Sequence, residues 1–270
     1  MPQLLACTTS GALCFDFYGD KHMHEREALL QRIMDIGELM MRSGAEINRV
    51  EDTLRRIGEA YGAHMDVYAI IFSIVITMRY PDGEVITQTR RVGDRDDIDF
   101  VRLDQLNALS RRCCAHPMKP DELEQEIRKA GNIRGSLAET IAGNMLGAGS
   151  FSVFFGGSLA DGIAAALLSL IVVAVQRTMG RLSSNRILFT FAISAVVGIA
   201  IGVCCGLLKD LNRAMVMIGD IMLLNPGVTM INAVREMMVG NTISGQLRLI
   251  ESVSWALAMA AGFMIAMHLV

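Results

Sequence analysis

The second half of this chain is almost free of charged side chains, and no other feature constrains its fold as strongly. The chain has 25 Lys and Arg residues and 28 Asp and Glu residues, yet only 12 of them lie from residue 141 onward. Because a charge in hydrocarbon is costly, a long charge-poor stretch is typical of a segment that crosses a lipid bilayer. The first half is charged like a water-soluble protein. We therefore expect a soluble domain followed by a membrane domain.

Five apolar segments in the second half approach the ~20 residues that a helix needs to cross hydrocarbon. They are residues 137–155, 158–176, 187–208, 214–233 and 250–269. The predicted fold class is an α-helical multi-pass membrane domain of about five spans, preceded by a small α+β cytoplasmic domain. The expected domains are a flexible leader (1–22), the cytoplasmic domain (23–132) and the transmembrane domain (133–270).

The positive residues outside these spans predict the orientation of the chain. Most of them belong to the same side: Arg128, Lys129, Arg134, Arg177, Arg181, Arg186, Arg235 and Arg248. The other side has Lys209 and Arg213. Since loops rich in Lys and Arg stay in the cytoplasm, we expect the soluble domain to be cytoplasmic and the protein to lie in the cell inner membrane.

The soluble half contains two stretches with helical spacing at its start and two at its end. The first helix is expected over residues 24–42, and the second ends at Gly62. Helices are also expected over residues 98–114 and 120–131, separated by two X-Pro pairs.

Between these helices the sequence predicts two strands. Residues 65–78 are rich in β-branched side chains, and the nearly unbroken apolar run 67–72 predicts one strand covered on both faces. The turn sequence Pro81-Asp82-Gly83 leads into an alternating return strand over 84–92. The outward face of the return strand would carry either Thr87, Thr89 and Arg91 or Gln88 and Arg90.

The span 214–233 contains the sequence Asn225-Pro226-Gly227, which should kink or break the helix. Transporters use such breaks to offer free backbone groups to a polar substrate near the membrane midplane. Thr229 and Asn232 would share a face with Asn225 if the helix resumed. We therefore predict a substrate site at Asn225, Pro226, Gly227, Thr229 and Asn232, while a plain structural kink is the alternative.

Three further polar residues are candidates for coupling or for lining a pore. Asp220 lies inside the same span, near its predicted outer end and two turns from Arg213 on the same face. It has either a coupling or substrate role or the role of a solvated or paired structural acid. Asn241 and Ser244 follow the span, either as a helix cap or turn or as a re-entrant polar loop.

Other classes of function find no support in the sequence. No block of basic residues indicates nucleic-acid binding, and the five histidines show no zinc-ligand spacing. The sequence has no P-loop and no G-x-S-x-G motif. We expect no catalytic residue, cofactor or metal, and a chain that is not an enzyme.

The order of several motifs resembles the threonine/serine exporter family over about residues 25–269. The matching motifs are Met41-Arg42-Ser43-Gly44-Ala45-Glu46-Ile47-Asn48-Arg49-Val50-Glu51-Asp52-Thr53-Leu54, then Phe155-Gly156-Gly157-Ser158, and Asn225-Pro226-Gly227-Val228 onward to Gly240. The resemblance implies a cytoplasmic domain followed by about ten spans in two halves. Five spans then imply an N-terminal-half subunit of a split, oligomeric exporter, completed by a second small membrane subunit. One split system of this type is associated with succinate.

These observations favour a subunit of a secondary transporter that exports a small polar metabolite, either a threonine- or serine-like amino acid or a dicarboxylate such as succinate. One alternative is a membrane-anchored enzyme, in which substitutions of Glu51 and His64 would abolish turnover. The other alternative is a regulatory scaffold whose soluble domain binds a partner.

Overall fold

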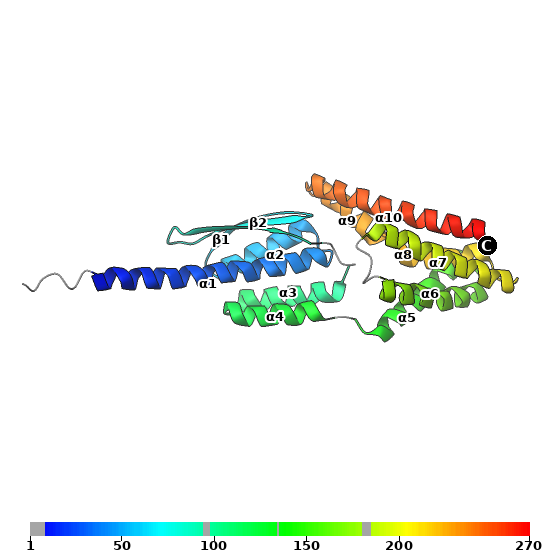
Figure 1. Cartoon of the computed structure of the whole chain (residues 1–270), viewed down its shortest axis with the longest axis horizontal. Coiled ribbons are helices and arrows are strands. Elements are labelled where there is room, and N and C mark those ends of the chain that lie inside the picture. The colour runs from blue at the N-terminus through cyan, green and yellow to red at the C-terminus, as the bar shows by residue number, and fades with distance from the viewer. Residues whose placement is uncertain (1–8, 94–97, 134, 180–184) are drawn as a thin grey trace, which may run out of the picture. The chain divides into compact units, whose positions relative to one another are not determined.

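The structure is a computed structural model that describes residues 9–93, 98–133, 135–179 and 185–270. The chain divides into two compact units, Met1–Arg134 and Gly135–Val270, and each unit is described by itself (Figure 1). The predicted boundary lay between residues 132 and 133. Of the positive residues used to predict orientation, Arg134 and Arg181 lie outside the described residues.

The first unit contains four helices, α1 (Thr9–Arg42), α2 (Ile47–Ala60), α3 (Phe100–Ala115) and α4 (Pro120–Asn132). α1 therefore begins inside the segment that the sequence predicted as a flexible leader. α1 stops where Gly44 adopts a φ of 88°, a conformation that side chains with a Cβ rarely adopt. Pro120 is the first residue of α4, where its missing N–H costs no hydrogen bond.

Three strands lie between these helices: β1 (His64–Ile70), β2 (Ser73–Arg79) and β3 (Val85–Arg91), in the antiparallel order β1-β2-β3. The prediction of one strand over residues 65–78 is wrong, because the chain reverses at Ile71 and Phe72. Alternate side chains of β1 and β2 are buried, so only one face is covered. The apolar run was misleading because Tyr68 and Phe72 are 60% and 48% exposed.

The first unit has three layers, with the sheet on one side of α1 and α2, and with α3 and α4 on the other side (Figure 1). α1 contacts β2 and β3 as well as α3 and α4. Its side chains therefore fill the centre of the core, which includes the fully buried residues Leu30, Ile33 and Met34.

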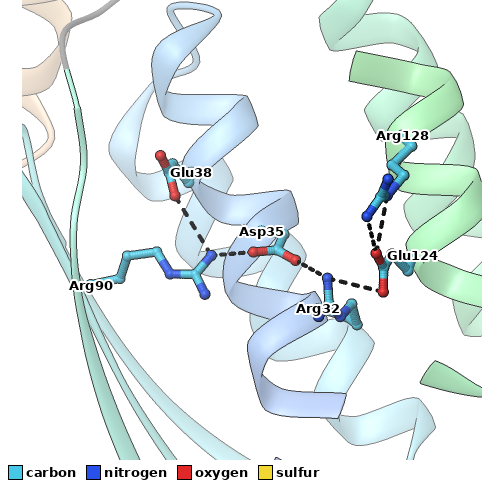
Figure 2. Close-up of polar contacts among 6 residues, drawn as sticks. All are labelled: Arg32, Asp35, Glu38, Arg90, Glu124 and Arg128. Atoms are coloured by element: carbon cyan, nitrogen blue, oxygen red, sulfur yellow. Dashed lines mark hydrogen bonds and ion pairs between the residues drawn. The ribbon is translucent and has the colours of Figure 1, made fainter. Parts of the chain in front are cut away.

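A chain of ion pairs joins β3, α1 and α4 in the first unit. It consists of Arg32, Asp35, Glu38, Arg90, Glu124 and Arg128 (Figure 2). Arg90 pairs with Asp35, and Arg32 lies 2.9 Å from Asp35 and 3.4 Å from Glu124. Arg90 is half-buried, so the face of β3 that carries Arg90 points toward the protein. The outward face therefore carries Thr87, Thr89 and Arg91, which is the first of the two predicted alternatives. Single exposed pairs contribute little, but this connected set fixes the sheet and α4 on α1.

The second unit is entirely helical in its described part. Its helices are α5 (Leu137–Phe154), α6 (Leu159–Met179), α7 (Arg186–Leu207), α8 (Arg213–Leu224), α9 (Gly227–Met238) and α10 (Thr242–Leu269). Among the described residues, α6, α7 and α10 are long and apolar enough to cross a membrane, and the bent pair α8–α9 provides a fourth candidate span. α5, which contains Glu139 and Asn144, is not among these candidates, so the count of five spans stays a prediction.

Glycines bring the helices of the second unit into close contact. A Cβ added to Gly198 of α7 would lie 2.6 Å from the Cβ of Ala266 in α10. A Cβ added to Gly219 of α8 would lie 2.5 Å from the backbone oxygen of Ala148 in α5. Close approach of backbones is the usual way in which membrane helices gain packing energy, because lipid supplies no hydrophobic drive between them.

The last helix is longer than the sequence predicted. α10 begins at Thr242 rather than at residue 250, so the prediction that Arg248 lies in a loop is wrong. Arg248 is in the second turn of α10 and is only 2% exposed. Arg235, the other positive residue of that predicted loop, is exposed on α9.

Candidate functional site

The predicted break in the fourth span is present, and it lies between α8 and α9. α8 ends at Leu224, Asn225 has an extended backbone, and α9 begins at Gly227. The two helix axes differ by 49°. Pro226 explains the break, because it has no N–H to donate and its ring clashes with the preceding turn. The helix resumes when the N–H of Met230 donates to the backbone oxygen of Pro226 at 3.0 Å.

This break produces two helix ends inside one apolar segment. The last carbonyl groups of α8 and the first N–H groups of α9 have no partners within their own helices, as at any helix end. The N-terminus of α9 carries the positive end of its helix dipole and favours a negative group such as a carboxylate. The arrangement can therefore bind a small solute that carries both hydrogen-bonding groups and negative charge.

The predicted substrate-site residues surround this break. Asn225 is exposed, and Pro226 and Gly227 are partly exposed. Thr229 and Asn232 are half-buried on α9, three residues apart, so they share a helix face. Their role in binding a substrate stays a prediction.

The two halves of the broken span pack against different helices. α8 contacts α5, α6 and α7, whereas α9 packs against α10. In Figure 1, α9 lies beside α10. The break therefore lies between two helix segments that pack against different neighbouring helices.

Asp220 lies in α8, five residues before the break, and is completely buried. Within the described part of the chain, neither of its carboxylate oxygens has a hydrogen-bond partner. It forms no ion pair with Arg213, the positive residue two turns earlier on α8. Thus the alternative of a structurally paired acid finds no support in these contacts.

Sequence reasoning missed a buried ion pair beyond the break. Nη2 of Arg248 in α10 lies 3.2 Å from Oε1 of Glu236 in α9, and both side chains are 2% exposed. The available signal was Gly240, because glycine commonly ends a helix, and in the structure this residue has a φ of 102°. A helical hairpin at this turn brings residues from both sides together, and Glu236 and Arg248 lie four residues before and eight residues after Gly240.

The two remaining candidates occupy the turn between α9 and α10. The N–H of Asn241 donates to the backbone oxygen of Glu236 at 2.9 Å, and Asn241 directly precedes α10. Ser244 is buried in the first turn of α10. This geometry is that of a tight helix–helix turn, and the assignment of either residue to a pore stays a prediction.

Two residues of the first unit bear on the enzyme alternative. Oε1 of Glu51 in α2 accepts a hydrogen bond from the N–H of Ala69 in β1 at 2.8 Å. Nε2 of His64 lies 3.6 Å from Asp66 on the exposed face of β1. Both contacts have a structural explanation, since they hold β1 to α2 and pair residues along its outer face.

Comparison with known protein families gives a match to nearly the whole chain. The family described as putative threonine/serine exporters matches residues 31–270. The chain belongs to this family. The match covers both units, from within α1 to the end of α10, and so includes the break and Asp220. No curated protein and no solved structure matches the chain.

Membership of the threonine/serine exporter family agrees with the arrangement of the second unit. The protein is a membrane protein of a transporter family, with apolar helices long enough to cross a bilayer. A family of exporters also implies a small substrate that must pass through the apolar region. The break between α8 and α9 is a place in that region where backbone groups are available.

Proposed function

We propose that the chain is a subunit of a secondary transporter that exports a small carboxylate-bearing metabolite from the cytoplasm. The substrate is a threonine- or serine-like amino acid, or a dicarboxylate such as succinate. Both classes carry at least one carboxylate, and the N-terminus of α9 suits that group. Membership of an exporter family supports a role in transport. The substrate class and the direction of transport, from the cytoplasm outward, are part of this proposal.

The observation that carries the proposal is the break at Asn225 and Pro226. Backbone that leaves the helix at membrane depth is tolerated only where it is buried in protein or faces a wet cavity. A bend of 49° keeps α8 and α9 pointing in the same general direction, so the pair suits a span that continues across the bilayer. In known transporters such discontinuous helices bind the substrate near the midplane.

The proposal includes five spans, with α5 as the first. α5 contains Glu139 and Asn144 and is not among the candidate spans of the described residues, and the companion subunit of a split exporter would cover these polar residues. We accordingly propose that a second small membrane subunit of the same family completes an oligomer. The assembly would lie in the cell inner membrane, with the first unit in the cytoplasm.

Transport by inverted vesicles of the native membrane tests this function, because any companion subunit is present there. Vesicles that contain the chain should exchange external labelled substrate for internal unlabelled substrate. The substrates to compare are threonine, serine and succinate, and vesicles without the chain are the control. Exchange of none of the three above the control level would refute the proposal.

The variant Pro226→Ala tests the site within the proposed function. Alanine restores an N–H and favours a continuous helix by about 3 kcal/mol relative to proline. We expect the substrate flux to fall more than tenfold, while the amount of assembled protein in the membrane changes little. Pro120→Ala is the matched control, because Pro120 lies at the first position of α4. A Pro226→Ala protein with normal flux would show that the break binds no substrate.

A further inference from the structure

Asp220 is a buried acid in the interior of a membrane unit, and it has no partner among the residues that the structure describes. Its side chain has no exposed surface. Of the described residues, none donates a hydrogen bond to either carboxylate oxygen. An ionised carboxylate in such a place costs several kcal/mol, because it loses its water and gains no compensating charge. The protonated, neutral form avoids most of this cost.

α8 packs closely against its neighbours beside Asp220, in agreement with the complete burial of this acid. The neighbouring residue, Gly219, lies against Ala148 of α5 and Ala165 of α6, at 2.5 and 3.0 Å from an added Cβ. Ser152 of α5 is also fully buried on this side, 3.2 Å from the same position. Its hydroxyl oxygen has no hydrogen-bond partner among the described residues. Asp220 of α8 and Ser152 of α5 are thus both polar side chains that are shielded from water, in two helices that pack against each other.

No charged side chain described in the structure compensates Asp220. The ionisable residues on the helices packed against α8 lie in the first or last turns of those helices: Glu139, Asp161, Arg177, Arg186, Cys204 and Cys205. The buried carboxylate of Asp161 already accepts hydrogen bonds from Ser158 and from the N–H of Asn212. On α8 itself, Arg213 is two turns away and forms no ion pair with Asp220.

We propose that Asp220 carries the proton of the export cycle. Its carboxyl group is protonated while α8 packs against α5 and α6, and it ionises only in a conformation that admits water. On opening, the O–H bond breaks, the electron pair stays on the carboxylate oxygen and the proton passes to water. The ionised group cannot return to the packed state until it binds a proton. Opening and closing of this interface are therefore tied to the release and uptake of one proton per cycle.

This inference rests on the proposed export function, and the variant Asp220→Asn tests it in the same inverted vesicles. Asparagine has the shape of the neutral acid but cannot release a proton. Two fluxes are compared: exchange of labelled for unlabelled substrate, and net accumulation under an imposed pH gradient. We expect exchange to persist and accumulation to stop at equal concentrations inside and outside. Glu139→Gln, at an exposed acid of α5, is the matched control and should accumulate substrate as the native chain does.

Two results of this experiment would overturn the inference. Accumulation driven by the pH gradient in Asp220→Asn would show that another group carries the proton. Loss of both fluxes in a correctly assembled Asp220→Asn protein would show that Asp220 binds substrate or supports the fold. By contrast, if the native chain exchanges no substrate, the proposed function itself has failed.

Infrared spectroscopy tests the protonation of Asp220 without any transport. Surface aspartates are ionised at about pH 8, so a protonated-carboxyl band from 13C-labelled aspartate reports a buried acid. We expect this band in the native protein and not in Asp220→Asn. If the native protein lacks the band, Asp220 is ionised in the packed state and the inference is wrong, whether or not the variant folds.

Discussion

Removing one partner of the ion pair between Glu236 and Arg248 should destabilise the second unit more than removing both. The charged atoms lie 3.2 Å apart, and each side chain is 2% exposed. At an effective dielectric constant of about 20, charges at this separation attract by about 5 kcal/mol. This attraction offsets the cost of removing both groups from water. A single substitution loses the attraction and leaves the remaining charge buried, so we expect a cost of about 3–5 kcal/mol.

The expected pattern for three variants follows from this balance. Glu236→Leu and Arg248→Met each leave one buried charge, and each should lower the unfolding temperature by roughly 6–20 °C. The double variant leaves no charge and should recover most of the loss, because an apolar pair of similar volume often replaces a buried ion pair without cost. Arg235→Met is the matched control, since Arg235 is exposed on α9, and its effect should stay within about 0.5 kcal/mol.

The chain provides its own probe for this measurement. It has one tryptophan, Trp255 of α10, whose ring lies 4.2 Å from the guanidinium carbon of Arg186 in α7. Tryptophan fluorescence of the protein in detergent therefore follows the separation of α10 from α7 during heating. The reasoning is refuted if the double variant is as unstable as the worse single variant, or if either single variant unfolds at the native temperature.

Two further predictions concern packing and thiol reactivity. Gly219→Ala should destabilise the second unit by about 1–3 kcal/mol, because the added methyl group meets the backbone oxygen of Ala148. Gly206→Ala is the control, since nothing lies within 4 Å of an added methyl group there. In the same fluorescence assay this control should be neutral. In the first unit, burial raises the pKa of Cys113 to about 11. Of the two neighbouring thiols, maleimide in mild alkali should therefore label the exposed Cys114 and not Cys113. Mass spectrometry that finds equal labelling of these two thiols would contradict the burial of Cys113.

Charge distribution and periodicity predicted the helices of the second unit well, because both follow directly from contact with hydrocarbon. The break at Pro226 was also predictable, since it depends on local backbone chemistry. The reversal at Ile71 and Phe72 was not, because an apolar run is equally consistent with one two-sided strand and with two strands whose outer residues happen to be apolar. The pattern of apolar residues indicates which side chains are buried. It does not indicate where the chain turns back between two strands.

The environment of Arg248 was unpredictable for a related reason. A charged residue at the edge of an apolar segment is normally placed in water, and that rule assigned Arg248 to a loop. Its actual position depends on Glu236, which lies across the turn and on another helix. Likewise the sequence showed that Asp220 lies within a span, but its lack of a partner among the described residues depends on how α5, α6 and α7 pack against α8.

One physical rule separates the buried polar groups along the broken span into two kinds. Glu236 beyond the break forms an ion pair with Arg248, and this pair holds α9 on α10. Asp220 before the break forms no ion pair within the described part of the chain, and neither of its carboxylate oxygens has a hydrogen-bond partner there. A buried charge with an oppositely charged partner is stabilised by that partner, whereas a buried carboxylate without one gains free energy when a proton or water reaches it. The functional positions of this span should therefore be Asp220 and the break, and the ion pair should be the support against which they move.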